Sequence, residues 1–281
     1  MHSPHAHSVV VITGSTKGIG LGLAKAFLTY GWCVVISGRD SKLLTSVLQQ
    51  LQQLYPQKNM LAVACDITNS DDVTQLWQKS AHHFGHIDLW INNAGTCHAA
   101  QAFVNLAAID ICTTLNTNLY GSMLCAQTAL KGMNQQGFGR IFNMEGWGSQ
   151  GEWSEGMTAY ATSKSAIRYF TKALCKETRH SAVHIGSLSP GMVATDLLIS
   201  SWQQGNAKNW HKMYWLFHFV IDPPDVVCDY LVKKMILSQH SKCHFVRYTW
   251  MTPLRLILRF FNPYYWRRNP IKGTALEHIK K

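Results

Sequence analysis

The chain has little that would carry it into or through a membrane. No apolar run approaches the roughly 20 residues that a membrane-spanning helix needs. Residues 1–8 are polar and include His2, His5 and His7. They have neither the apolar segment of a secretory signal nor the arginine- and serine-rich character of a transit peptide. We therefore expect a cytoplasmic protein with no signal or transit peptide, and a solvated tail rather than a metal site at the three histidines.

Cysteine pairs and acidic residues are also scarce. The eight cysteines form no Cys-x-x-Cys pair, and most lie in apolar segments, which is typical of reduced, buried thiols. Only 15 residues are acidic against 26 Lys and Arg, so the formal net charge is +11. Such a charge suits nucleic acid, the phosphates of a cofactor or an anionic membrane surface. Because no nucleic-acid motif accompanies it, we expect no nucleic-acid partner.

With 281 residues, of which 47% are hydrophobic, the chain can form one α/β domain over residues 1–281. Apolar runs typical of buried strands alternate with helical patterns, which predicts a doubly wound parallel sheet of the Rossmann type. Ligands bind such sheets at the carboxyl ends of the strands. The expected strands are 9–13, 33–37, 60–66, 88–92, 140–144 and 183–188. One expected helix follows the first strand and ends at residue 30, and the other expected helices cover 42–54, 70–84, 109–135 and 158–180.

The first strand leads directly into a glycine-rich turn. Glycines permit a tight turn and a close approach of the backbone, and the helix that follows can direct its N-terminus at a pyrophosphate. The turn therefore predicts a cradle for a dinucleotide, and an ordinary structural turn is the alternative. Its residues are Gly14, Ser15, Thr16, Lys17, Gly18, Ile19 and Gly20.

The end of the second strand bears on the choice of cofactor. An acidic residue there would bind the ribose 2′-hydroxyl of NADH. This chain has Arg39 at that point and Lys17 in the glycine turn, and both suit a 2′-phosphate. Asp40, one residue further on, is the competing feature. We predict NADPH rather than NADH.

Tyr160 and Lys164 lie four residues apart in an expected helix and so share one face. A free phenol has a pKa of about 10 and exchanges protons poorly at neutral pH. An ammonium beside it favours the phenolate and lowers that pKa. The pair suits proton exchange with a carbonyl or hydroxyl oxygen. On its own, the spacing also fits an ordinary pair on a helix surface.

Together these elements resemble the short-chain dehydrogenase/reductase family. The matching motifs occur in the family's order, at its spacing, over about residues 9–200. They are Thr13-Gly14-x-x-x-Gly18-x-Gly20, Asp66, Asn92-Asn93-Ala94-Gly95, Asn118, Tyr160-x-x-x-Lys164 and Pro190-Gly191 with Thr195.

The resemblance implies roles for these residues. Tyr160 is the proton donor, Lys164 lowers its pKa and binds the nicotinamide ribose, and Asn118 holds a water of the proton relay. The cofactor site that the resemblance implies adds Asp66, Ile67, Asn93, Ala94, Gly95, Pro190, Gly191, Val193 and Thr195 to the glycine turn and Arg39.

One family residue is missing. A serine normally follows the fifth strand and bonds the substrate oxygen, but this chain has Gly146 there, with Glu145 before it and Ser149 three residues after it. We expect Gly146 to make room for a bulky substrate, and Ser149 or a water to replace the serine. Glu145 either faces outward as a polar loop residue, which we favour, or faces inward and raises the pKa of Tyr160.

The stretch from Ile141 to Ser149 is similar to the one found in chlorophyll(ide) b reductases, a group within the family that also lacks the serine. Those enzymes reduce a formyl group of chlorophyll b with NADPH. The resemblance implies carbonyl reduction on a bulky, hydrophobic substrate.

Substrate choice is expected to reside in the segment 196–222, which is rich in aromatic residues. Trp202, Trp210 and Trp215 would suit a lid over a large, flat, apolar ligand. A helix pair packed over the sheet edge is an equal alternative. The two readings are compatible, since one helix can do both.

The C-terminal extension, 252–281, begins with a short amphipathic pattern. Thr252-Pro253 is a good helix start, and Leu254, Ile257, Leu258 and Phe261 then recur at helical spacing, with Arg255 and Arg259 beside them. The pattern is typical of a helix lying on a membrane surface. Docking on the body of the protein or on a second subunit is the alternative.

We predict an NADPH-dependent reductase of a bulky hydrophobic carbonyl compound, forming a homo-oligomer and contacting a membrane peripherally. One alternative is a reductase of another lipophilic alcohol or ketone, such as a sterol, retinoid or quinone. The other is a non-catalytic NADPH-binding protein at a membrane.

Overall fold

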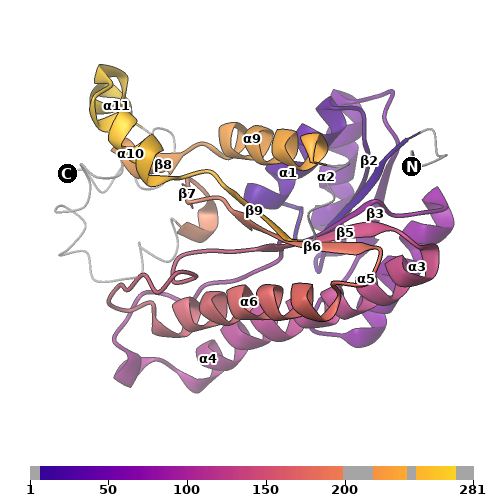
Figure 1. Cartoon of the computed structure of the whole chain (residues 1–281), viewed down its shortest axis with the longest axis horizontal. Helices are drawn as coiled ribbons and strands as arrows, with labels where there is room; N and C mark the ends of the chain where they lie inside the picture. The colour runs from indigo at the N-terminus through magenta and orange to yellow at the C-terminus, as the bar shows by residue number, and fades with distance from the viewer. Residues whose placement is uncertain (1–6, 199–217, 239–244, 270–281) are drawn as a thin grey trace.

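The computed structural model describes residues 7–198, 218–238 and 245–269. In this part of the chain, seven strands form one parallel sheet in the order β3-β2-β1-β4-β5-β6-β9 (Figure 1). The order runs outward from β1 in both directions, which confirms the doubly wound sheet. The strands are β1 (Val9–Ile12), β2 (Cys33–Gly38), β3 (Met60–Ala64), β4 (Leu89–Asn92), β5 (Gly139–Met144), β6 (Val183–Ser189) and β9 (Phe245–Thr249).

The central strand β1 is apolar throughout because helices cover both faces of the sheet (Figure 1). All four residues of β1 are buried. Val10 and Ile12 belong to one apolar core and Val11 to a second, since successive side chains of a strand point to opposite faces. The first core includes side chains of α1 (Gly18–Thr29), α2 (Ser41–Leu54) and α9 (Pro224–Leu237), and the second includes those of α3 (Ser70–Phe84) and α5 (Ser122–Gln136).

The long helix expected over 109–135 is interrupted. A π-helical turn, Asn116–Gly121, separates α4 (Ala108–Leu115) from α5. Such turns are rare and frequently occur at functional sites. The turn contains Asn118, so the break falls at one of the predicted catalytic residues.

The strand β9 is not among the expected strands. It pairs in parallel with β6 and forms an edge of the sheet, where its residues are half-buried. One of them, Arg247, reaches the active site region, as described below. Because an edge strand lacks the long apolar pattern of a central one, sequence periodicity does not reveal it.

A buried carboxylate connects the C-terminal extension to the body. Asp222 lies in the short strand β8 (Ile221–Asp222) and is almost fully buried. Its carboxylate accepts hydrogen bonds from Trp250 Nε1 at 2.6 Å and Arg268 Nη1 at 2.8 Å, and it forms an ion pair with Arg259 Nη1 at 2.7 Å. A buried charge is tolerated only with such partners. The three donors come from the segment 250–268, which Asp222 therefore holds in place.

The same interactions decide which way the C-terminal helices face. In α10 (Pro253–Phe260) the Arg259 side chain is buried against Asp222, and the Arg255 guanidinium lies 3.9 Å from the centroid of the Trp250 ring. The apolar side of α10 is left exposed. Figure 1 shows α10 and α11 (Pro263–Arg267) standing out from the end of the molecule. None of the helices in the described ranges is long and apolar enough to cross a membrane.

Candidate active site

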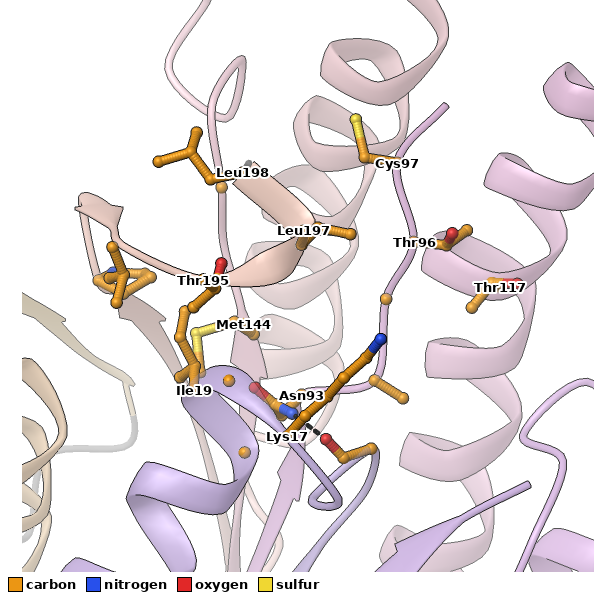
Figure 2. Close-up of a pocket in the computed structure, with 18 of the residues that line it drawn as sticks. Lys17, Ile19, Asn93, Thr96, Cys97, Thr117, Met144, Thr195, Leu197 and Leu198 are labelled. Carbon is orange, nitrogen blue, oxygen red and sulfur yellow. Dashed lines mark hydrogen bonds between the residues drawn. The ribbon is translucent and has the colours of Figure 1, made fainter. Parts of the chain in front are cut away.

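A pocket of about 570 Å³ opens at the carboxyl ends of the parallel strands. Its lining comes from the loops after β1, β2, β3, β4, β5 and β6, where a doubly wound sheet is expected to bind ligands. Figure 2 shows Thr195, Leu197 and Leu198 on one side of the pocket, Thr96, Cys97 and Thr117 on the other, and Lys17, Ile19 and Asn93 at its base.

The glycine turn forms one end of this pocket, and its backbone requires glycine. Gly14 has φ of 61°, and a Cβ there would lie 2.7 Å from Ala94 Cα. Asn93 Nδ2 donates to the carbonyls of Thr13 and Gly14, at 2.9 and 3.0 Å, which ties the loop after β4 to the turn. The N-terminus of α1 is thereby left open to the pocket, as a bound pyrophosphate requires.

Ser15 plays a different part from its neighbours. Its side chain is buried, its Oγ donates to the Ile12 carbonyl at 2.8 Å, and it accepts from the Ser37 amide at 2.8 Å. Ser15 thus joins the ends of β1 and β2 and does not line the pocket. The rest of the predicted cofactor set does line it, from Gly14, Thr16, Lys17, Gly18, Ile19 and Gly20 through Arg39, Asp66, Ile67, Asn93, Ala94 and Gly95 to Pro190, Gly191, Val193 and Thr195.

The carboxylates near Arg39 have distinct roles. Asp40 caps α2: its Oδ1 accepts from the amides of Lys42 and Leu43 at 2.9 and 3.0 Å. Asp66 faces the pocket, and its Oδ1 accepts two hydrogen bonds from Thr68. Burial raises the pKa of Asp66, but those bonds and the charge of Arg39 outweigh it and lower the pKa.

The helix α6 (Thr158–Glu177) brings Tyr160 and Lys164 to the middle of the pocket. Lys164 is buried, and its Nζ lies 5.8 Å from the centroid of the Tyr160 ring and donates to the Met144 carbonyl at 3.2 Å. A Cβ on Gly95 would lie 3.7 Å from that Nζ. The lysine therefore reaches across the pocket floor to the ends of β4 and β5.

Asn118 is fully buried in the π-helical turn. Its Oδ1 accepts from the Thr96 amide at 2.7 Å, and its Nδ2 donates to the Thr96 carbonyl and to Ser163 Oγ. These bonds fix the pocket wall after β4 against α6. The amide side chain is thus committed to protein partners, and the neighbouring Thr117 is the residue of the turn that lines the pocket.

Burial dominates the proton affinities of the catalytic pair. It raises the pKa of Tyr160 above the ordinary value for a phenol, and Cys97 adds to that rise. It lowers the pKa of Lys164 to about 8, against the raising effects of Cys97 and Glu145. The lowered tyrosine pKa expected from the sequence is therefore wrong, because burial removes the phenolate from water and so disfavours it. A neutral phenol is the form that can donate a proton.

These features match a known family. The family model described as short chain dehydrogenase covers residues 8–206. The chain belongs to the short-chain dehydrogenase/reductase family. It is therefore an enzyme, an oxidoreductase that uses a nicotinamide cofactor.

Several curated relatives share most of this chain. A probable chloroplastic chlorophyll(ide) b reductase of Oryza sativa is 34% identical over 89% of this chain, but the chain spans only 51% of that relative's length. A second rice chlorophyll(ide) b reductase, also chloroplastic, is 34% identical over 90% of this chain and 74% of its own. A 3alpha-hydroxysteroid dehydrogenase of Mediterraneibacter gnavus is 28% identical over 68% of this chain and 76% of its own.

Solved structures share the fold. An actinorhodin polyketide ketoreductase with NADPH superimposes with a TM-score of 0.78 at 22% identity, covering 90% of this chain and 99% of that one. A 3-ketoacyl-(acyl-carrier-protein) reductase from Brucella melitensis complexed with NADH gives 0.74 at 22% identity, covering 88% and 98%.

This member of the family departs from the usual pattern at Gly146. A Cβ at that position would lie 2.5 Å from the Tyr160 hydroxyl oxygen and 3.2 Å from Lys164 Cε. The space that the missing side chain leaves is therefore filled by the tyrosine itself, whereas the sequence suggested that a substrate would use it. Glycine at this position therefore permits the tyrosine's placement.

Ser149 does not lie at the pocket surface. Its Oγ accepts from the Gly146 amide at 3.0 Å and donates to the Lys164 carbonyl at 3.3 Å, so it braces the loop after β5 against α6. The structure thus gives it no direct path to a substrate oxygen. The predicted lid residues Trp202, Trp210 and Trp215 lie outside the described residues.

The preference for an outward-facing Glu145 is wrong. Its side chain is only 2% exposed and pairs with Arg247 of β9. The pairing could not be anticipated, because 102 residues separate the partners and β9 itself was not expected.

Sequence reasoning also missed two apolar residues of the pocket, Trp147 and Met157. They line it together with Leu197 and Leu198, which belong to the predicted substrate segment 196–222. Trp147 and Met157 lie in the segment that connects β5 to α6. The position of Trp147 directly after Gly146 was the one feature of the sequence that could have indicated a place in the pocket. We call Trp147, Met157, Leu197 and Leu198 the apolar wall of the pocket that Tyr160 also lines.

The contact between Gly146 and Tyr160 predicts that restoring the family's serine will harm this enzyme. Gly146→Ser and Gly146→Ala place the same Cβ against the tyrosine, so both are expected to displace the hydroxyl and lower kcat by about 100-fold. Nicotinamide binding, measured by fluorescence titration, is expected to persist in both variants. A serine variant that is more active than the alanine variant and the unmodified enzyme would contradict this explanation.

Proposed function

We propose that the enzyme reduces the carbonyl group of a bulky hydrophobic compound with NADPH, and that its substrate is a formyl-bearing tetrapyrrole of the chlorophyll(ide) b type. One observation carries the proposal: Tyr160, a neutral proton donor, lines the same pocket as a dinucleotide cradle and an apolar wall. The apolar wall suits a ligand with extensive nonpolar surface.

The reaction balances with one hydride and one proton. NADPH, when bound in the cradle, supplies the hydride that reaches the carbonyl carbon. Tyr160 donates its proton to the carbonyl oxygen, so the product is an alcohol. Lys164, as an ammonium, offsets the negative charge left on the tyrosine oxygen. The buried setting strengthens that attraction because little water competes with it.

The preference for NADPH follows from the groups around the second strand's end. Lys17 and Arg39 both line the pocket and carry positive charge, which suits the 2′-phosphate. Asp40, the residue that could have favoured NADH, caps α2 with its carboxylate and is not among the residues that line the pocket.

The choice of substrate rests on the relatives and on the pocket together. The relatives named chlorophyll(ide) b reductase match nine tenths of this chain at about one third identity. A reductase of sterol-like ketones is the second candidate, and the match to a 3alpha-hydroxysteroid dehydrogenase favours it. Because both candidate substrates are large, rigid and apolar, the apolar wall does not show which of the two the enzyme prefers.

Replacing the proton donor tests the mechanism. Tyr160→Phe is expected to abolish reduction while NADPH still binds, because the change removes only the hydroxyl. The measurement is single-turnover NADPH oxidation with a formyl-bearing tetrapyrrole, a steroid ketone and a small aldehyde. Undiminished turnover in Tyr160→Phe would rule out the mechanism, and faster turnover of the steroid ketone than of the tetrapyrrole by the unmodified enzyme would favour the second candidate.

Reversing a charge tests the cofactor preference. Arg39→Asp is expected to shift the preference from NADPH to NADH, since the new carboxylate repels the 2′-phosphate and can bind a 2′-hydroxyl. Loss of a charge-assisted hydrogen bond corresponds to roughly 1.5–3 kcal/mol, or about 10- to 100-fold in the Kd of NADPH. Lys42→Asp, an exposed change nearby that does not line the pocket, is the matched control. Equal binding of NADH and NADPH by the unmodified enzyme would refute the assignment.

We also propose that the enzyme contacts a membrane peripherally through α10. Leu254, Ile257, Leu258 and Phe261 are each more than half exposed, while Arg255 and Arg259 are turned toward the body. The exposed face is therefore apolar. The adjacent helix α11 exposes Tyr264 and Trp266, which have the mixed apolar and polar character of residues at a lipid–water boundary.

This arrangement predicts membrane binding that depends on apolar insertion more than on charge. The double variant Ile257→Ser, Leu258→Ser is expected to lose binding to phosphatidylcholine vesicles containing anionic lipid, measured by co-sedimentation. The matched control is Leu54→Ser, a similarly exposed leucine on α2. Raising the salt concentration to about 0.5 M screens charges but is expected to release little protein. Full release by salt would instead indicate electrostatic attachment.

A further inference from the structure

Trp147 lies in the loop after β5, between two glycines that both pack against the catalytic helix α6. A Cβ on Gly146 would lie 2.5 Å from the Tyr160 hydroxyl oxygen. Gly148 has φ of 92°, and a Cβ there would lie 2.5 Å from Ala161 Cα. Both glycines thus permit an approach that a side chain would obstruct. The backbone on each side of Trp147 is therefore held close to the helix that carries the tyrosine.

Hydrogen bonds fix the same loop. Ser165 Oγ of α6 donates to the Gly148 carbonyl. The Ser149 amide donates to the Gly146 carbonyl at 3.1 Å, and Ser149 Oγ accepts from the Gly146 amide at 3.0 Å. The segment 146–149 is thus a turn that is closed on itself and bonded to α6. The position of the Trp147 backbone relative to the catalytic helix is therefore set by the fold.

The indole of Trp147 differs from the indoles in the core. Those of Trp90 and Trp250 are buried, and each donates its Nε1 hydrogen to a side-chain oxygen. Trp147 is 41% exposed and lines the pocket, and its indole makes no hydrogen bond or ring contact with any residue in the described ranges. A single exposed aromatic residue is ordinary on a protein surface. In the lining of the active-site pocket, however, such a ring is a surface that a substrate can cover.

The shape of an indole favours one class of ligand. Its flat π-face stacks on another flat, conjugated ring, and such a pair gains attraction beyond the burial of apolar area. A tetrapyrrole macrocycle presents a flat conjugated face, whereas a saturated steroid presents an uneven aliphatic one. Stacking on Trp147 would therefore distinguish the two candidate substrates, which the apolar wall as a whole does not.

We propose that Trp147 is a specificity-determining residue, an aromatic platform on which a planar conjugated substrate stacks with its carbonyl group directed at Tyr160. The inference rests on the proposed function, because it names the substrate class of the same site. Gly146, which adjoins Trp147 in the chain and lies close to the tyrosine hydroxyl, fixes the platform relative to the proton donor. The competing explanation is that Trp147 is merely one of four apolar side chains, replaceable by any other of similar size.

Two substitutions separate these explanations. Trp147→Phe keeps an aromatic face, and Trp147→Leu keeps an apolar side chain without one. The main probe is a methyl-bearing tetrapyrrole, which lacks the reactive formyl group and so reports binding alone. Its Kd is expected to rise about 10-fold in Trp147→Leu and about threefold or less in Trp147→Phe. The Kd values of a saturated steroid ketone and of NADPH are expected to change less than about threefold in both variants.

The matched control is Trp153→Leu. Trp153 belongs to the same loop and is 79% exposed, but it does not line the pocket. This change is expected to leave tetrapyrrole binding as it is in the unmodified enzyme. An equal loss in Trp153→Leu would overturn the proposal, because the pigment would then be held by the exposed loop and not in the pocket.

The Kd of the tetrapyrrole is measured from its absorbance, and that of the steroid ketone by displacement of the tetrapyrrole. Melting temperature and NADPH binding show that each variant is folded. A loss confined to the tetrapyrrole and larger in Trp147→Leu than in Trp147→Phe supports the proposal. An unchanged tetrapyrrole Kd in Trp147→Leu, equal losses in the two variants, or an equal loss for the steroid ketone would overturn it, as would a tetrapyrrole that does not bind at all.

Fluorine NMR of the full chain labelled with fluorotryptophan gives a second readout on the native side chain. The Trp147 signal is assigned by its loss in Trp147→Phe. The ring current of a macrocycle stacked on the indole is expected to shift this signal, and a saturated steroid has no such current. A Trp147 signal that stays in place while the tetrapyrrole binds would overturn the proposal. If Trp147→Leu does not fold, this shift decides the question alone.

The binding measurements keep this inference separate from the proposed function. An enzyme that reduces none of the carbonyl probes, yet binds the methyl-bearing tetrapyrrole through Trp147, would refute the proposed function and support the platform. An enzyme that reduces the formyl-bearing tetrapyrrole equally well in the unmodified form and in Trp147→Leu would support the proposed function and refute the platform.

Discussion

The burial of a charged lysine beside a neutral tyrosine is the constraint on which the active site depends. An ammonium in this position loses its hydration, and its hydrogen bond to the Met144 carbonyl offsets part of that loss. The tyrosine remains a phenol because its ionised form would lose hydration too. The absence of a side chain at Gly146 then lets the hydroxyl approach the strand end. These three conditions support the proposed proton donation in a site without the family's serine.

A second buried charge organises the C-terminal part in a comparable way. The carboxylate of Asp222 binds Trp250, Arg259 and Arg268. Its backbone carbonyl accepts a hydrogen bond from the Ala194 amide at 3.0 Å, next to the pocket wall. The arginines that a helical pattern assigns to a membrane surface are thereby drawn into the protein. An amphipathic sequence shows that a helix has two faces, but the partner that covers each face is decided by long-range contacts.

The sequence determined the parts of the molecule that depend on local chemistry. Buried parallel strands need continuous apolar runs, so the Rossmann sheet was predictable from segments such as 9–13 and 33–37. The glycine turn was predictable because few residues tolerate the backbone of Gly14. Tyr160 and Lys164 could be paired from spacing alone because helical geometry places them on one face. Asp40 is the exception, since its capping role depends on where α2 begins.

Only the tertiary structure decided the features that join distant segments. The carboxylate of Glu145 is buried because Arg247 lies beside it, and nothing in either local sequence indicates the pairing. The proton affinities of Tyr160 and Lys164 depend on how much water the fold removes, which spacing does not reveal. Ser149 turns away from the pocket because the loop after β5 bonds to α6. Motifs name the groups that can react, whereas packing and desolvation between remote segments decide their orientation and charge.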